Sequence, residues 1–213
     1  MELVGSDSLN DGQMRAAYHR QCLWRWHADS ETLVVDELGL QHGKIRADIA
    51  VVNGHLTGFE IKSDFDRLDR LPSQVDGYSA VFDRATLVVT RRHLERASAL
   101  VPEWWGLVEA SQGPHGGVRF ATRRRARRNP SVDDFSVAQL LWRTEAQEVL
   151  LDLGTEPRGL RGNRASLYRL LVSRLSSREL RERVREKMKS RPGWRCLSPL
   201  SQGDDWFRPS ATL

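Results

Sequence analysis

Residues 46–63 read RADIAVVNGHLTGFEIKS. Two runs rich in β-branched and apolar residues, 46–52 and 57–63, flank the dipeptide Asn53-Gly54. An Asn-Gly pair between such runs is the strongest short signal for a tight turn that joins two antiparallel strands. This stretch therefore predicts a β-hairpin, from which the rest of a sheet extends.

The length of the turn determines which side chains of the two strands meet. A three-residue turn pairs Val52 with Leu56. This register places Asp48 opposite Glu60. Lys62 then lies on the same face as Glu60, because the side chains of a strand alternate between its two faces. Directly opposed side chains are about 5 Å apart, so we expect two carboxylates and an ammonium group to share one small patch.

A third strand is predicted just before this hairpin. Residues 32–38 are again rich in β-branched residues, and Gly39 and Gly43 follow them. A loop centred between His42 and Gly43 places Glu37 opposite Asp48. Three acids and one lysine are thus expected on one patch of the sheet.

The segments around these strands predict an α/β fold. A helix capped by Asn10 or Asp11 precedes them, and a helix with a proline in its first turn runs from about Pro72 to Phe82. The buried run 85–90 then predicts another strand. A strand, helix and strand that follow a hairpin imply a mixed sheet with helices on its faces. Further predicted elements are a helix over 92–100, an edge hairpin of 107–110 with 118–121, and helices over 137–151, 166–175 and 177–189.

The length of 213 residues favours one sizeable domain with an appendage. We expect a core over residues 1–122 and a basic helical extension over 123–213. Through Asp83 the chain has 8 Lys and Arg against 14 Asp and Glu, and the remainder has 25 against 14. An acidic half joined to a basic half suits an enzyme that acts on a polyanion. The alternative explanation of the basic half is a genome that favours arginine codons.

The composition excludes several classes of protein. The 39% hydrophobic and 29% charged residues are ordinary for a globular protein with a real core. The two cysteines, Cys22 and Cys196, have no CxxC spacing, which argues against a disulfide framework or a cysteine zinc site. No apolar run approaches the roughly 20 residues of a membrane span, and the first residues show no export signal. We expect a cytoplasmic protein with no membrane partner; a monomer and a homodimer both stay open.

The acid patch predicts a divalent cation. Like charges on a half-buried sheet are unfavourable unless a cation lies among them. Oxygen ligands without cysteine or histidine favour Mg²⁺ or Mn²⁺ over Zn²⁺. Such an ion binds phosphate oxygens and lowers the pKa of water. Lys62 is one of only four lysines in an arginine-rich chain, and it would orient the water or hold the scissile phosphate.

The spacing of the acids and the lysine resembles the signature of the PD-(D/E)xK nuclease superfamily. Asp48, with Glu60-x-Lys62 on the next strand, matches the signature, and Ala47 stands where the signature has proline. The strings 46–49 and 59–63 are also similar to a small bacterial and phage group related to MmcB-like repair proteins. The resemblance implies a restriction-endonuclease-like mixed β-sheet flanked by helices, here with a helical C-terminal extension.

A second motif supports the same resemblance. Gln74 and Tyr78 match the QxxxY helix motif of RecB-type nucleases, and they follow the lysine strand as that motif does. The two residues share one helix face, and Arg70 lies one turn earlier if the helix extends past Pro72. The resemblance implies that they brace the site or contact the nucleic-acid backbone.

The resemblance implies metal-dependent hydrolysis of phosphodiester bonds, with Mg²⁺ or Mn²⁺ as the cofactor. Asp48, Glu60 and the carbonyl of Ile61 would be metal ligands. Lys62 would be the catalytic lysine, and Glu37 would assist as a further acid. We expect nucleic acid as the partner, DNA rather than RNA, in DNA repair or in a phage or mobile-element context.

Plainer interpretations stay open beside this one. Glu60 and Lys62 can form a simple ion pair, and Asp48 can form another with Arg46. Five tryptophans can pack in the core or stack on unpaired bases, packing being the commoner role: Trp104, Trp105, Trp142, Trp194 and Trp206. The basic run 123–128 is either a solvated surface or a strip that grips phosphates, with Arg123, Arg124 and Arg125 at its start.

Two other classes of function compete with the nuclease. The first is a catalytically inactive nucleic-acid-binding module that keeps the same scaffold. The second is a protein-binding role within a mobile element or a defence system. The complete set of three acids and one lysine favours the enzyme.

Overall fold

The computed structural model describes residues 8–113 and 116–194. Six strands form one mixed sheet, and they lie side by side in chain order. The first three pair antiparallel, the third to the fifth pair parallel, and the sixth returns antiparallel. The strands are β1 (Leu33–Leu40), β2 (Ile45–Val52), β3 (Leu56–Lys62), β4 (Arg84–Thr90), β5 (Gly106–Gln112) and β6 (Val118–Arg124).

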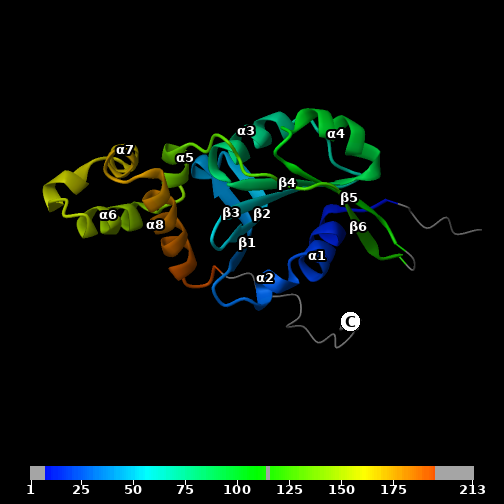
Figure 1. The fold of residues 1–213 in the computed structure, drawn as a ribbon, viewed down its shortest axis with the longest axis horizontal. Helices are drawn as coiled ribbons and strands as arrows, with labels where there is room; N and C mark the ends of the chain where they lie inside the picture. The colour runs from blue at the N-terminus through cyan, green and yellow to red at the C-terminus, as the bar shows by residue number, and fades with distance from the viewer. Residues whose placement is uncertain (1–7, 114–115, 195–213) are drawn as a thin grey trace, which may run out of the picture.

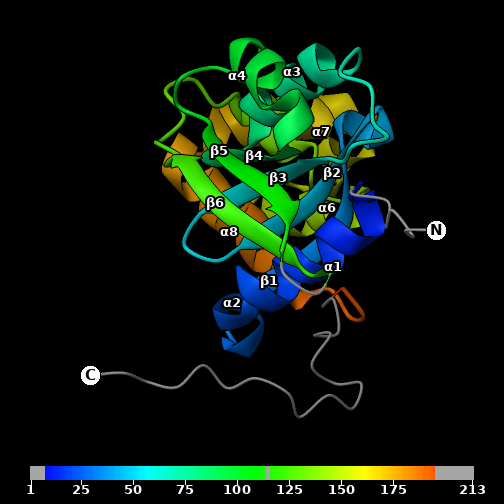
Figure 2. The ribbon, with the colours of Figure 1, turned by 90° about the vertical axis from the view of Figure 1, so that its right-hand side faces the viewer.

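Helices cover both faces of this sheet, as Figures 1 and 2 show. On one face lie α3 (Leu71–Val81) and α4 (Leu94–Leu100), which form the crossovers that parallel strands require. On the other face lies α1 (Asp11–Gln21), followed by α2 (Trp24–Ala28). The structure confirms the predicted α/β fold, with a mixed sheet flanked by helices and a helical C-terminal region.

The predicted hairpin register is also confirmed. Val52 pairs with Leu56 across the turn. In the preceding pair, Asp36 lies opposite Ile49 and Leu38 opposite Ala47, so Glu37 occupies the position opposite Asp48. The short turns and the alternating buried residues determine this register locally.

Helix α1 is anchored at its start and along its buried face. The Asn10 carboxamide oxygen accepts from the backbone N–H of Gln13 at 2.8 Å, and the Gln13 side chain bonds back to the N–H of Asn10 at 3.1 Å. Such a reciprocal cap satisfies two free donors of the first turn. Met14 and Tyr18 are buried in the core on this side of the sheet. The helix therefore holds a fixed position over β3 and β6.

Helix α3 packs unusually close to the sheet at one point. A Cβ added at Gly58 in β3 would lie 2.6 Å from the ring of Phe82 and 2.9 Å from the ring of Tyr78. Only glycine, which lacks a side chain, permits this approach. The close packing brings the Tyr78 hydroxyl down to the level of the strands.

The C-terminal helices extend beyond the β1 side of the sheet (Figure 1). Their buried side chains, among them Leu180 and Met188, belong to the same hydrophobic cluster as Val52 and Leu87 of the sheet. The expected domain boundary at residue 122 falls within β6. The elements are α5 (Asp134–Ala138), α6 (Arg143–Asp152), η4 (Pro157–Arg161), α7 (Arg164–Arg174) and α8 (Ser177–Ser190).

The prediction of one continuous helix over 137–151 is wrong. Helix α5 ends at Ala138 and α6 begins at Arg143. Trp142 between them has an extended backbone, and its N–H donates to the Glu145 carboxylate at 2.7 Å. This cap starts a new helix, because the carboxylate satisfies a donor that a continuous helix would have paired internally.

Across residues 8–113 and 116–194, no helix combines the length and the apolar character needed to cross a membrane.

Candidate active site

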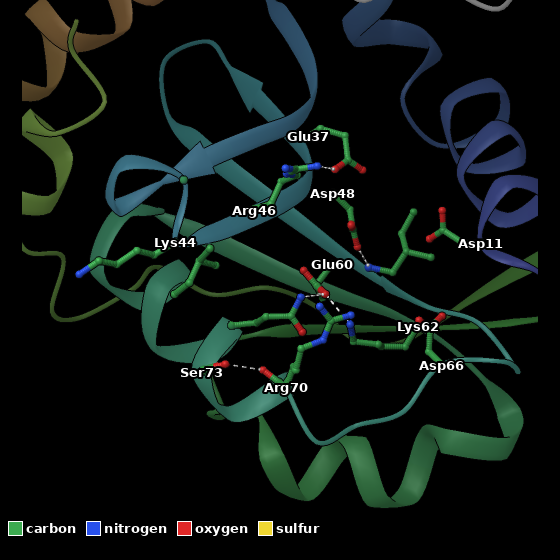
Figure 3. Close-up of a pocket in the computed structure, with 14 residues that line it drawn as sticks. Asp11, Glu37, Lys44, Arg46, Asp48, Glu60, Lys62, Asp66, Arg70 and Ser73 are labelled. Carbon is green, nitrogen blue, oxygen red and sulfur yellow. Dashed lines mark hydrogen bonds and ion pairs between the residues drawn. The ribbon is translucent and has the colours of Figure 1, made fainter.

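Asp48, Glu60 and Lys62 come together at the open end of the β2–β3 hairpin, away from its turn (Figure 3). Regular pairing of the two strands stops at Ile49 and Phe59, one step before Asp48 and Glu60. Beyond that point a side chain replaces the backbone pairing, since the Asp48 carboxylate accepts from the N–H of Ile61 at 2.7 Å. On β3 itself, Lys62 Nζ donates to Glu60 Oε1 at 2.7 Å.

These side chains open into a cavity of about 450 Å³. Its wall comes from β1, β2, β3, the turn between β1 and β2, and the N-terminal ends of α1 and α3. Figure 3 shows acidic and basic groups facing one another across it. A wall of this kind suits a charged ligand. The polar lining residues are Asp11, Glu37, Lys44, Arg46, Asp48, Glu60, Lys62, Asp66, Arg70, Ser73 and Gln74.

Helix α3 supplies two of the contacts that hold Glu60. The Glu60 carboxylate is fully buried and accepts from the Tyr78 hydroxyl at 2.6 Å. It also accepts from the Gln74 side-chain amide. Together with Lys62, these donors satisfy both carboxylate oxygens, which an isolated buried charge could not achieve. The two α3 residues lie one helical turn apart, as the sequence spacing predicts.

Arg15 of α1 is a site residue that the sequence did not reveal. Its Nη2 lies 3.2 Å from Asp48 Oδ1, 2.9 Å from Glu37 Oε1 and 3.3 Å from Asp11 Oδ2. Its Nη1 donates to the backbone oxygen of Asp48 at 2.7 Å. One guanidinium group therefore binds three acids from three elements. The i, i+4 spacing of Asp11 and Arg15 on a capped helix was the only local signal of it.

Glu37 has a contact pattern different from that of Asp48 and Glu60. Its backbone is in the left-handed region, with φ of 57°, and the regular pairing of β1 with β2 skips this position. Its carboxylate lies 2.9 Å from Arg15 and 3.3 Å from Arg46. Glu37 thus lines the cavity, but its charge is already paired with two arginines.

The pKa of Asp48 is raised to about 7. Burial is the main cause, because desolvation disfavours the charged carboxylate, and the nearby Glu60 adds repulsion. Three groups lower this pKa without cancelling the rise: the hydrogen bond from the Ile61 N–H and the positive charges of Arg15 and Lys62. Burial and the charge of Glu60 likewise raise the pKa of Tyr78 well above its ordinary value. Burial therefore favours the protonated form of Asp48, and a cation bound beside its carboxylate would favour the ionised form.

The donor atoms fit a hard divalent cation. Within the described part of the chain, no three His, Cys, Asp or Glu side chains gather as a metal-binding group. Mg²⁺, however, is commonly held by one or two carboxylates and keeps several waters. Asp48 and Glu60 would supply those carboxylates, with the Ile61 carbonyl between them in the chain. Gln74 Oε1 is buried and has no hydrogen-bond partner among the described residues, so one more oxygen is unsatisfied in this wall.

The predicted arginines divide into two groups. Arg70 lines the cavity at the start of α3. Arg123, Arg124 and Arg125 do not line it. Arg123 is paired with the buried Glu109 at 2.6 Å. Arg124 donates to the backbone oxygen of Trp105 at 2.8 Å.

Comparison with known proteins places this chain in a phage family. The family model for bacteriophage P4 protein cII matches residues 16–196. Protein cII of Enterobacteria phage P4 is 31% identical over 163 residues, which are 76% of this chain; the matched region spans 60% of the phage protein. A solved structure of a protein of unknown function from Silicibacter pomeroyi aligns with 74% of this chain and 97% of its own, at 18% identity and a TM-score of 0.41. The chain belongs to the family of bacteriophage P4 protein cII.

Proposed function

We propose that this protein is a Mg²⁺- or Mn²⁺-dependent nuclease that hydrolyses phosphodiester bonds, with DNA as its substrate. The observation that carries the proposal is the convergence of Asp48, Glu60 and Lys62 at the end of one hairpin, inside a polar cavity. The resemblance to the PD-(D/E)xK superfamily supports it, because the same residues match that signature. The phage relative is consistent with action in a phage or mobile-element setting.

Each residue has a role that follows from its contacts. Asp48 and Glu60 would hold the cation, which would offset the charge of the phosphate and lower the pKa of water. Lys62 uses one of its three N–H donors on Glu60, which leaves two for a phosphate oxygen or a water molecule. Tyr78 orients the Glu60 carboxylate from behind.

Basic groups at the mouth of the cavity would bind the neighbouring phosphates. Lys44, Arg46 and Arg70 line the same cavity as the acids. Lys44 and Arg70 make no side-chain ion pair within residues 8–113 and 116–194, so their charges are available to a polyanion. Phosphate contacts of this kind position a nucleic acid without reading its sequence.

Cleavage assays on the full chain test the proposal. The protein should cut DNA with Mg²⁺ or Mn²⁺ and stop on addition of EDTA, and Glu60→Gln and Lys62→Ala should each lower the rate at least about 100-fold. Glu109→Gln is the matched control, because Glu109 is a buried, ion-paired acid outside the cavity. Cleavage that survives both site changes would refute the nuclease.

One observation favours a second candidate, a catalytically inactive nucleic-acid-binding module on the same scaffold. Arg15 already places a cation among Asp11, Glu37 and Asp48, as a purely structural ion-pair network would. This candidate predicts DNA binding that depends strongly on salt but responds neither to EDTA nor to Lys62→Ala.

A further inference from the structure

A second cavity, of about 320 Å³, adjoins the acid cavity. Gly43, in the turn between β1 and β2, lines both cavities. The second cavity differs in character, because aromatic and arginine side chains make up much of its wall. They are His42 from the turn, Trp142 and Arg143 at the start of α6, Arg164 and Tyr168 on α7, and Trp194 after α8.

Trp142 and Trp194 form one wall of this cavity, in which Trp142 is exposed and both rings contact Arg191. The Trp142 side chain is 49% exposed, although tryptophan is usually buried. The guanidinium of Arg191 lies 4.4 Å from the centre of the Trp142 ring and 4.1 Å from that of Trp194. Arg191 is itself fixed by two contacts of 2.6 Å to Glu145 and one of 2.7 Å to the Leu140 carbonyl. The indoles are therefore preorganised for contact with a ligand.

A second aromatic pair lies in the same cavity. The rings of His42 and Tyr168 stack with centres 5.8 Å apart and an angle of 26° between their planes. Tyr168 is buried, and its hydroxyl donates to the Leu141 carbonyl at 2.9 Å. His42 is exposed and has a left-handed backbone, with φ of 59°. The turn thus holds an imidazole ring against the cavity at the expense of an uncommon conformation.

The cavity also carries uncompensated positive charge. Glu145 meets the charge of Arg191. Arg143 and Arg164 form no ion pair or side-chain hydrogen bond with any other residue of the described chain. They are the first residues of α6 and α7, whose N-terminal ends add partial positive charge. Flat aromatic surfaces beside free arginines suit a ligand with a planar ring and a phosphate.

We propose that this aromatic cavity binds an unpaired nucleotide of a nucleic-acid strand. Its base would stack on the indole of Trp142, and its phosphate would contact Arg143 and Arg164. The inference rests on the proposed nuclease function for the choice of a nucleic-acid strand as the ligand. A strand that crosses the turn at Gly43 reaches the acid cavity. It narrows the substrate class to nucleic acid with a single-stranded segment, because neighbouring bases cover both faces of a base inside a duplex.

Binding of short strands tests the role of the bases. The full chain in EDTA is titrated against a labelled strand of eight thymidine nucleotides and against an abasic strand of equal length, with fluorescence anisotropy as the readout. The wild-type protein should prefer the strand with bases by about tenfold, the range of one stacked base. Trp142→Ala should abolish that preference, and Trp142→Tyr should retain part of it.

Two further variants make the result specific. Trp24→Ala is the matched control, because Trp24 on α2 is 43% exposed and has an arginine, Arg25, over its ring at 5.1 Å, but lies outside the cavity. It should keep the preference. The double change Arg143→Ala and Arg164→Ala should lower the affinity for both strands by the same factor and reduce the salt dependence of binding. It also tests the cavity independently if Trp142→Ala lowers the stability of the fold.

The outcomes separate this inference from the proposed nuclease. An unchanged preference in Trp142→Ala, or no preference in the wild-type protein, overturns the nucleotide cavity, whatever Glu60→Gln does to cleavage. A preference that disappears in Trp142→Ala supports the cavity even if Glu60→Gln still cuts DNA and the nuclease assignment fails.

Discussion

The Tyr78 hydroxyl contacts both β2 and β3, and it donates to the Glu60 carboxylate on β3 at 2.6 Å. It also accepts from the N–H of Asp48 at 3.2 Å, and the Phe59 carbonyl oxygen lies 3.0 Å away. It therefore stands at the position where backbone pairing of β2 with β3 ends. One hydroxyl from α3 links the position of one acid to that of the other.

Tyr78→Phe should remove these links while keeping the ring in the core. The N–H of Asp48 and one oxygen of Glu60 would lose a partner in a buried site, so we expect a loss of about 1–3 kcal/mol in the free energy of unfolding. Cleavage should fall more than the loss of stability explains, since Glu60 would be less well oriented. Urea denaturation and cleavage rates measured on the same samples check both effects.

Tyr18→Phe is the control for this prediction. Tyr18 is also buried and packs on Phe59 and Phe120, but its hydroxyl has no hydrogen-bond partner within residues 8–113 and 116–194. The change should alter the unfolding free energy by less than about 0.5 kcal/mol. Equal losses from Tyr78→Phe and Tyr18→Phe would show that the hydroxyl bridge contributes nothing.

Gly58→Ala should push α3 away from the sheet. The new Cβ would lie 2.6 Å from the Phe82 ring and 2.9 Å from the Tyr78 ring, both too close for van der Waals contact. We expect the free energy of unfolding to fall by about 1–3 kcal/mol, as for other overpacked cores. Gly54→Ala, in the open turn with no atom within 4 Å of the new Cβ, should be nearly neutral. A neutral Gly58→Ala would mean that α3 moves freely at this point.

Arg15→Met should leave the acids around Arg15 without the cation that they share. Asp48, Glu37 and Asp11 would lose their shared cation, so the protein without metal should become less stable and the affinity for Mn²⁺ should rise several-fold. Calorimetric titration with Mn²⁺ measures the affinity, and Arg20→Met, at an exposed position of the same helix, is the control. A lower Mn²⁺ affinity in Arg15→Met would show that Arg15 positions the ligands and does not compete with the cation.

The parts of the fold that depend on local patterns were predictable. The Asn53-Gly54 turn and the alternation of buried residues determine the register of β2 and β3, and therefore the meeting of Asp48 with Glu60. The spacing of Gln74 and Tyr78 determines that they share a helix face. Each of these conclusions requires only neighbours in one strand, one turn or one helix.

The rest depends on contacts between distant segments. Arg15 reaches Asp48 across 33 residues, and no periodicity distinguishes it from Arg20, the other arginine of α1. The left-handed backbone at Glu37 turns a predicted ligand toward two arginines, and a strand pattern does not reveal such a residue. The aromatic cavity likewise forms only when α6, α7 and the turn at His42 pack together.

The raised pKa of Asp48 predicts a dependence of stability on pH. The folded protein holds a proton on Asp48 up to a pKa of about 7, whereas the unfolded chain releases it near 3.8. Between these values the folded state binds more protons, so the free energy of unfolding decreases as the pH rises through this window. Asp48→Asn has no such proton, and relative to the wild type it should gain about 2 kcal/mol of stability from pH 5 to pH 8.

Urea denaturation in EDTA at pH 5, 6, 7 and 8 measures this difference. Asp76→Asn, at an exposed position of α3, should track the wild type across the whole range. Added Mn²⁺ should restore the stability of the wild-type protein at pH 8 but not that of Asp48→Asn, because a bound cation favours the ionised carboxylate. A difference between wild type and Asp48→Asn that stays constant with pH would show that Asp48 is ionised throughout, and that Arg15 and Lys62 already neutralise the acids without a metal.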